Sequence, residues 1–406
     1  MSAADSIVID CDSHVMEPPD LWEKYLEPKF RDRAIRIVKD PGDGLEVLMV
    51  DNQPLLKGML AGLGGANQPR QELFIPGRLG YLDGCPTASY LPAERVKLLD
   101  QWGVNAGVLF PTVGILWDVE DHELAAAYAR AYNNWINDFA SSVRSRVIPI
   151  AHIALQDVDS ALAELKRCIK LGFKGIFLAP ETVGGRRFSH PDFDPIWREC
   201  EEAGIPACLH VIVRFNRPPG IIGQFYQPGE FRTVFGFALG GFAQVAPAAM
   251  TMVADGLFDR FPRLKVLCVE AGCGWAPYIM DRMDQKYELL GWTFPTRLKP
   301  SDYFRRNLWV VAARRADDRR GDGSAGRGSR AMGIGFSARR FQPRSARSDS
   351  KCNRELECGP AAQIAGRECA NPVPGIIRYR RSNANDIFGT VVRTRCRVTR
   401  PSRTRR

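Results

Sequence analysis

The sequence lacks several features that would place it in common protein classes. Residues 1–5 have neither the basic nor the apolar region of a secretory signal peptide, so we expect a cytoplasmic protein. The 11 cysteines include no CxxC pair and follow no disulfide framework, which predicts mostly buried thiols. Residues 233–254 are uncharged, but several glycines and Pro247 interrupt them, which favours a buried helix or the wall of a pocket over a membrane span.

Lysine and acidic residues are scarce in the last part of the chain. Residues 313–406 contain 22 arginines, one lysine (Lys351) and 8 acidic residues, a net charge of +15, whereas the whole chain carries +10. Residues 1–312 therefore carry −5, and the basic character belongs to the tail. We predict two parts, a folded unit over residues 1–312 and a largely irregular, Arg-rich tail over residues 313–406.

An Arg-rich tail normally suggests nucleic acid, because each phosphate that a cation neutralises releases counterions. This tail has almost no lysine and no alternation of aromatic and basic residues, so we predict no specific nucleic-acid partner. A basic module that binds polyanions is a separate hypothesis, and salt-dependent binding to DNA would test it.

Residues 1–312 alternate short apolar runs with amphipathic segments, a pattern typical of βα units around a parallel sheet. We expect strands at residues 7–11, 106–110, 147–153, 175–178, 206–210, 266–269 and 308–311, and helices at 92–102, 122–142, 158–171 and 195–203. Seven strands are one short of a (β/α)8 barrel. Residues 27–90 form a long insertion after the first strand, and we expect them to shape a pocket.

Polar side chains follow three of these strands. The first strand ends in Asp12, His14 and Glu17, and Asp12 and His14 share one face because alternate residues of a strand point the same way. His210 and Glu270 follow the fifth and sixth strands, at the carboxyl ends where barrels gather their chemistry. The alternatives are a strand-end cap and a core histidine for the first pair, a core residue for His210, and a helix cap or an arginine partner for Glu270.

Other charged residues have weaker patterns. Arg186, Arg187 and Arg214 could hold a substrate carboxylate through bidentate hydrogen bonds, although exposed arginines are common. The remaining histidines are interpreted as structural or loop residues: His122 at a helix start, His152 in a strand and His190 beside Pro191.

Five ordered segments carry a resemblance to a known family. They read Asp-Cys-Asp-Ser-His-Val-Met-Glu-Pro-Pro-Asp-Leu-Trp (10–22), Gly-Phe-Lys-Gly-Ile (172–176), His-Pro-Asp-Phe-Asp-Pro-Ile-Trp (190–197), Gly-Ile-Pro-Ala-Cys-Leu-His (204–210) and Phe-Asp-Arg-Phe-Pro-Arg-Leu-Lys-Val-Leu-Cys-Val-Glu-Ala-Gly-Cys-Gly-Trp (258–275). The chain resembles the amidohydrolase-related family, the branch of the metal-dependent hydrolase superfamily that includes aminocarboxymuconate-semialdehyde decarboxylase and related aromatic-acid decarboxylases.

The resemblance implies an α/β fold, a (β/α)8 TIM barrel, with one divalent metal ion. It also implies nonoxidative decarboxylation, or hydrolysis, of a small aromatic or unsaturated carboxylic acid. Asp12, His14 and His210 stand where the family has metal ligands, and three protein ligands leave coordination positions for water or substrate. We expect zinc first and manganese as the alternative.

Two further residues take roles from the resemblance. Glu270 stands where some relatives use a histidine as acid or base, and a glutamate there could move a proton if burial raised its pKa. Glu17 would ligate the metal or orient His14 from outside the ligand set. A homodimer is expected because dimers are common among such relatives, and no membrane partner is expected.

One part of the family pattern is missing. The family has a fourth ligand, an aspartate at the end of the eighth strand that would activate water or protonate carbon, in a segment reading approximately Trp-Ala-Ser-Asp-Phe-Pro-His. This chain has Met-Gly-Ile-Gly-Phe-Ser-Ala-Arg at residues 332–339. When the codons of those residues are read one base later, the first becomes TGG, tryptophan, and the next six permit Ala, Ser, Asp, Phe, Pro and His in that order. We therefore interpret the tail as frameshifted, with the eighth strand lost or replaced by irregular chain. A catalytically impaired product of such a gene is the alternative to an active enzyme.

Overall fold

The computed structural model describes residues 6–65, 68–214, 234–313, 336–339 and 376–380. Consecutive parallel strands form the central barrel wall: β1 (Ser6–His14), β5 (Ala106–Phe110), β6 (Val147–Pro149), β7 (Ala151–His152), β8 (Ile176–Leu178), β9 (Ala207–His210), β10 (Val266–Val269) and β11 (Leu308–Ala313). Only Ile150 separates β6 from β7, so these two short strands are one pass of the chain across the wall. All seven predicted strands are confirmed, and parallel pairing runs from β1 to β6 and from β7 to β11.

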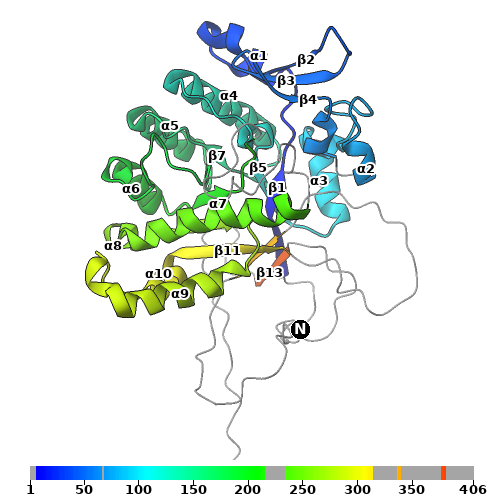
Figure 1. The fold of residues 1–406 in the computed structure, drawn as a ribbon. Coiled ribbons are helices and arrows are strands. Elements are labelled where there is room, and N and C mark those ends of the chain that lie inside the picture. The colour runs from blue at the N-terminus through cyan, green and yellow to red at the C-terminus, as the bar shows by residue number, and fades with distance from the viewer. Residues whose placement is uncertain (1–5, 66–67, 215–233, 314–335, 340–375, 381–406) are drawn as a thin grey trace, which may run out of the picture.

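Helices cover the outside of the strands (Figure 1). They are α3 (Pro92–Gln101), α4 (His122–Ser141), α5 (Val158–Lys170), α6 (Asp194–Ala203), α7 (Val234–Ala254), α8 (Leu257–Arg260), α9 (Trp275–Leu290) and α10 (Pro300–Asn307). Asp121 caps α4 by accepting from two backbone N–H groups, and Asp157 caps α5 in the same way with one. The left-handed Gly204, with a φ of 69°, ends α6 as the sequence predicted.

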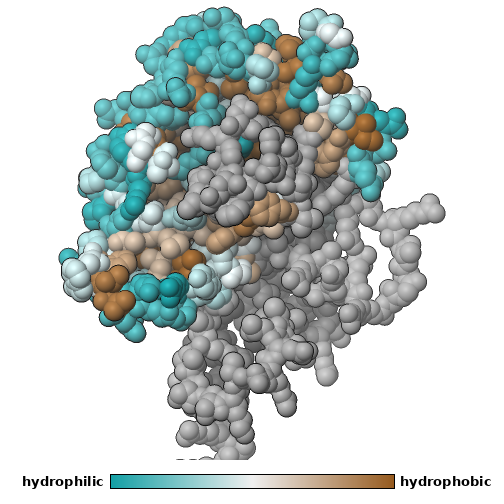
Figure 2. Space-filling model, in the orientation of Figure 1, coloured by the Kyte–Doolittle hydropathy of each residue, from teal (hydrophilic) through white to brown (hydrophobic). Residues whose placement is uncertain are grey.

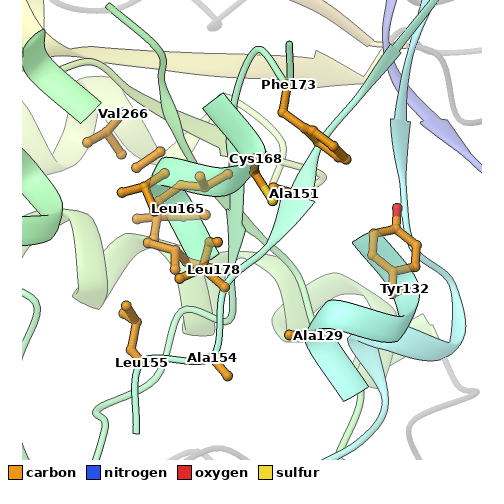
Figure 3. Packing of buried hydrophobic residues seen from close by; sticks show 14 of the residues in the cluster. Ala129, Tyr132, Ala151, Ala154, Leu155, Leu165, Cys168, Phe173, Leu178 and Val266 are labelled. Atoms are coloured by element: carbon orange, nitrogen blue, oxygen red, sulfur yellow. The ribbon is translucent and has the colours of Figure 1, made fainter. Parts of the chain in front are cut away.

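Apolar side chains form two layers, one on each side of the strands. The inner layer fills the barrel with residues such as Ile9, Val108, Phe177 and Trp309. The outer layer packs helices against strands, and Figure 3 shows part of it, with Leu165 of α5 beside Leu178 of β8. Strands that are buried on both faces explain the near-continuous apolar runs in the sequence.

The segment 27–90 follows β1 and lies at the carboxyl end of that strand (Figure 1). After α1 (Leu21–Tyr25) it holds an antiparallel sheet of β2 (Arg36–Lys39), β3 (Glu46–Val50) and β4 (Gln53–Lys57), with the short helices η2 (Pro28–Arg33), η3 (Leu60–Leu63), α2 (Arg70–Leu73) and η4 (Thr87–Ser89). Arg33 connects this insertion to the start of α4, because its guanidinium pairs with both Asp51 and Asp121.

Two short strands stand where the eighth parallel strand of a barrel is expected. β12 (Phe336–Arg339) pairs antiparallel with β11, and β13 (Ile376–Arg380) pairs antiparallel with β1. At these nine residues the chain is therefore paired and extended rather than irregular, and the outer edges of β1 and β11 are covered. The rest of the predicted irregular tail lies outside the described residues.

Two other expectations concerned residues 233–254 and the cysteines. Residues 234–254 form α7, with one side buried, and no helix in the described ranges has the length and apolar character needed to cross a bilayer. The seven described cysteines form no disulfide, and five of them are buried, as predicted.

Apolar surface gathers near the end of α9, where Leu289 and Trp292 are 65% and 85% exposed (Figure 2).

Candidate metal centre

A β-bulge near the end of β1 directs the first two site residues. Asp10 pairs with Gly107 and Ser13 with Leu109, so three steps along β1 match two along β5. The extra residue changes which side of the strand each later side chain faces. Ile9 and Cys11 belong to the barrel interior, and after the bulge Asp12 and His14 face the interior as well, while Asp10 and Ser13 face the helices.

Three predicted ligands meet at this mouth of the barrel. His14 Nε2 lies 3.1 Å from His210 Nε2 and 3.6 Å from Asp12 Oδ1, and His210 Nε2 lies 3.3 Å from the same oxygen. Among the described residues, these are the ones grouped closely enough to hold a metal ion, with all three ligand atoms within 4.8 Å of one another. Asp12 and His210 are buried, and His14 is partly exposed.

Backbone carbonyls fix the two imidazole rings in the orientation that a cation needs. His14 Nδ1 donates to Pro111 O at 2.9 Å, and His210 Nδ1 donates to Val211 O at 2.7 Å. With Nδ1 protonated, each neutral ring presents an Nε2 lone pair, and two lone pairs 3.1 Å apart repel unless a proton or cation lies between them. Asp12 Oδ2 is buried without a hydrogen-bond partner, so the donor set fits a bound cation.

Asp12 and His14 shift each other's pKa values toward the charged forms. Burial alone would raise the pKa of Asp12, but hydrogen bonds and charge interactions with His14 and His210 hold it below its usual value. Burial would lower the pKa of His14, and the Asp12 carboxylate more than offsets this, so that pKa is raised. The centre therefore keeps a carboxylate ionised in a buried position, as metal ligation requires.

Glu270 follows β10 and lies beside the three ligands. Its Oε2 is 3.7 Å from His210 Nε2, and 28% of its side chain is exposed. Desolvation of the carboxyl group raises its pKa, and the Asp12 carboxylate adds to the rise, while the two histidines oppose it. Its backbone has a φ of 59°, the left-handed region that non-glycine residues seldom adopt, which marks a conformation imposed by the surroundings.

Glu17 lies apart from the three ligands. Its buried carboxylate accepts hydrogen bonds from the backbone N–H groups of Thr112, Val113 and Gly114, at the start of η5 (Val113–Ile115). The preceding carbonyl of this turn, Pro111 O, is the acceptor for His14 Nδ1. Glu17 therefore reaches His14 indirectly, by ordering the turn that orients the ring.

The three arginines occupy different positions. Arg186 pairs with Asp192 at 2.7 Å, and Arg187, which is 59% exposed, pairs with Asp255 at 3.2 Å, so both belong to the surroundings of the loop after β8. Arg214 is 9% exposed and comes four residues after His210. Its guanidinium contacts Glu181 at 3.0 Å and donates to backbone carbonyls of the turn after β5.

His152 ends β7 and is a core histidine, as the sequence indicated. Its ring stacks on Trp117 with centroids 4.6 Å apart, and its Nε2 donates to Gly114 O. The side-chain amide of Asn133 bonds to both the N–H and the carbonyl of its backbone. Burial lowers the pKa of His152 to about 3, so the ring is neutral.

This buried histidine is expected to make the fold sensitive to acid. Its folded pKa lies below the unfolded value of about 6.5, so its contribution is intact above pH ~6.5 and is lost as the pH falls toward ~3. Between pH 7 and pH 4 the free energy of unfolding should fall by about 3 kcal/mol more in the wild type than in His152→Gln, as urea unfolding would measure. Equal slopes for the two proteins would contradict this expectation, and His190→Gln, on the surface, should behave as the wild type.

The family model for amidohydrolases matches residues 9–320, so the chain belongs to the amidohydrolase family. Its relatives include the gamma-resorcylate decarboxylase of Rhizobium sp. strain MTP-10005, which is 28% identical over 229 residues, covering 54% of this chain and 67% of the relative. The resemblance seen in the sequence is therefore confirmed, and this relative is a decarboxylase.

Solved structures share the fold. An amidohydrolase of Mycobacterium avium subsp. paratuberculosis K-10 superposes with a TM-score of 0.61 at 21% identity, covering 75% of this chain and 83% of that one. A 5-carboxyvanillate decarboxylase of Novosphingobium aromaticivorans DSM 12444, solved with manganese and 4-hydroxy-3-methoxy-5-nitrobenzoic acid, gives 0.52 at 20% identity, covering 76% and 78%. The predicted barrel class is confirmed, with the eighth parallel strand absent from the described residues.

Proposed function

We propose that this chain catalyses the nonoxidative decarboxylation of a small aromatic carboxylic acid with the help of one divalent cation. The observation that carries the proposal is the convergence of His14 Nε2, His210 Nε2 and Asp12 Oδ1 at the carboxyl ends of β1 and β9, with a protonatable carboxyl beside them. The same donor set also serves hydrolases, and the decarboxylase relatives favour the removal of CO2.

Asp12, His14 and His210 would hold the cation. When bound, it would act as a Lewis acid on oxygen atoms of the substrate. Two imidazoles and one carboxylate suit zinc, which was the first expectation. The solved 5-carboxyvanillate decarboxylase contains manganese, so both ions belong in the test.

Glu270 supplies the proton in this proposal. Its carboxyl group donates a proton to the ring carbon that bears the substrate carboxylate, the bond between that carbon and the carboxylate breaks, and CO2 leaves. The electron pair of the broken bond restores the aromatic ring. Glu270, left as a carboxylate, recovers a proton from water, to which its partial exposure gives access.

The test measures release of CO2 from 2,6-dihydroxybenzoate by the purified full chain supplied with Mn²⁺ or Zn²⁺. We expect metal-dependent turnover that Glu270→Gln lowers by about 10²- to 10⁴-fold, the usual contribution of a general acid. Glu288→Gln, an exposed glutamate of α9, serves as the control and should leave turnover unchanged. Turnover that survives complete chelation of metal would overturn the proposal.

Arg214 is the arginine that we propose as the carboxylate-binding residue. It is nearly buried, lies four residues after His210, and has its planar group held by backbone carbonyls and by the carboxylate of Glu181, so a substrate carboxylate would share or replace that partner. Arg214→Met is expected to raise KM by about 10-fold or more, the loss of one charge-assisted hydrogen bond, with a smaller change in kcat. Arg187→Met removes an exposed arginine and should leave KM within twofold of the wild type.

A second candidate is a chain that binds metal without turnover. The missing eighth-strand aspartate and the antiparallel strands beside β11 and β1 favour it. Stoichiometric metal binding with no CO2 release from any aromatic acid tried would select this candidate. The cytoplasmic location, the homodimer and the absence of nucleic-acid and membrane partners stay predictions.

A further inference from the structure

A group of buried polar side chains on the helix side of β1 surrounds the bulge. Asp10 and Arg95, which belongs to α3, are each 4% exposed, and Ser13 is 1% exposed. They face away from the barrel interior, so they contact neither the substrate side of the centre nor the ligand atoms themselves. Buried charged side chains are retained in proteins where they make specific hydrogen bonds.

Their hydrogen bonds all end on the bulged segment. Asp10 Oδ1 accepts from the backbone N–H of Asp12 at 3.1 Å, and Asp10 Oδ2 accepts from Ser13 Oγ at 2.8 Å. Arg95 donates to Ser13 Oγ at 3.3 Å and to the backbone carbonyl of His14. The backbone N–H of Asp12 and the backbone carbonyl of His14 are therefore hydrogen-bonded from the helix side of β1, at the place where the bulge disrupts the regular ladder of backbone hydrogen bonds.

The bulge decides whether these ligands can reach His210. In a regular strand Ile9 and Cys11 would share the barrel face with Ser13, and Asp12 and His14 would point toward α3. We propose that Asp10, Ser13 and Arg95 are positioning residues that stabilise the bulge and thereby aim Asp12 and His14 at the metal centre. The inference rests on the proposed metal site and adds to it the residues that preorganise it.

The experiment compares two buried serines that each accept a hydrogen bond from an arginine. Ser13→Ala removes the hydroxyl between Asp10 and Arg95. Ser301, in the first turn of α10, is 4% exposed and its hydroxyl accepts from Arg305 in the last turn; Ser301→Ala removes that hydroxyl. Binding of Mn²⁺ and Zn²⁺ to the full chain is measured by calorimetry, and unfolding of the metal-free proteins by urea.

Both variants should lose a similar, small amount of stability. Ser13→Ala is expected to bind metal about 10- to 100-fold more weakly than the wild type, the usual effect of removing a residue that orients ligands, whereas Ser301→Ala stays within twofold. Asp10→Asn keeps an oxygen that can accept from Asp12 and should retain more affinity than Asp10→Ala. Metal affinity within twofold of the wild type in folded Ser13→Ala and Asp10→Ala would overturn the inference. A wild-type chain that binds no metal would overturn the metal centre and this inference with it.

Discussion

Replacing His210 by alanine is expected to abolish specific binding of a divalent cation and, with it, turnover. His210 is fully buried, and its Nε2 is the atom that approaches both His14 and Asp12. Loss of a ligand should cost more than the roughly 10- to 100-fold that removal of an outer-shell partner costs. Titration calorimetry with Mn²⁺ and Zn²⁺ gives the affinity directly.

The matched control is His190→Ala, which removes an exposed histidine from the loop before α6 and should leave the affinity unchanged. Asp12→Asn tests the same centre with little change in side-chain shape, so a folded protein with lost affinity would separate ligation from stability. Wild-type affinity in both His210→Ala and Asp12→Asn would remove the centre from consideration.

Under the frameshift hypothesis, a chain with the restored reading frame is expected to show a large gain in decarboxylase activity. Codons from residue 313 onward, read one base later, permit the segment Trp-Ala-Ser-Asp-Phe-Pro-His in place of residues 332–338, with the tryptophan forced. The added aspartate would supply an acid–base group that the present chain lacks, a contribution of about 10²- to 10⁴-fold in rate. The measurement compares kcat/KM for CO2 release by the restored and present chains.

The control is the restored chain with an asparagine codon in place of that aspartate codon, which should lose the gain. A restored chain no more active than the present one would contradict the frameshift hypothesis as an account of function. Resequencing the DNA around codons 310–380 is the first check, because it decides whether the shift is in the gene or in the sequence read.

The barrel was predictable because its signal is local. Apolar runs of four to seven residues, several of them followed by an amphipathic helix with a cap or a glycine stop, define strands without any knowledge of their partners. The grouping of Asp12, His14, His210 and Glu270 was predictable because polar side chains at the carboxyl ends of parallel strands converge whatever lies between them in sequence.

The bulge was missed, although the sequence holds a signal for it. Ile9 and Cys11 are apolar at odd positions, and Asp12 and His14 are polar at even positions, so strict alternation places the ligands on the opposite face from the apolar pair. Only an extra residue lets both sets face the interior. The sequence offered two roles for Glu17, ligating the metal or orienting His14. It could not choose between them, because the contacts of Glu17 are with three backbone N–H groups about 95 residues further along the chain.

β12 and β13, which occupy the place of the eighth parallel strand, pair antiparallel with β11 and β1. This direction limits where the chain could place an acid in the role of the missing eighth-strand aspartate. Phe336 at the start of β12 pairs with Ala313 at the end of β11, and Ile376 at the start of β13 pairs with Asp10. A reversed strand presents its first residues, not its last, to the mouth of a barrel. A replacement acid would therefore have to stand at the first residues of these strands, Phe336 or Ile376, so evolution or design of this chain would act there.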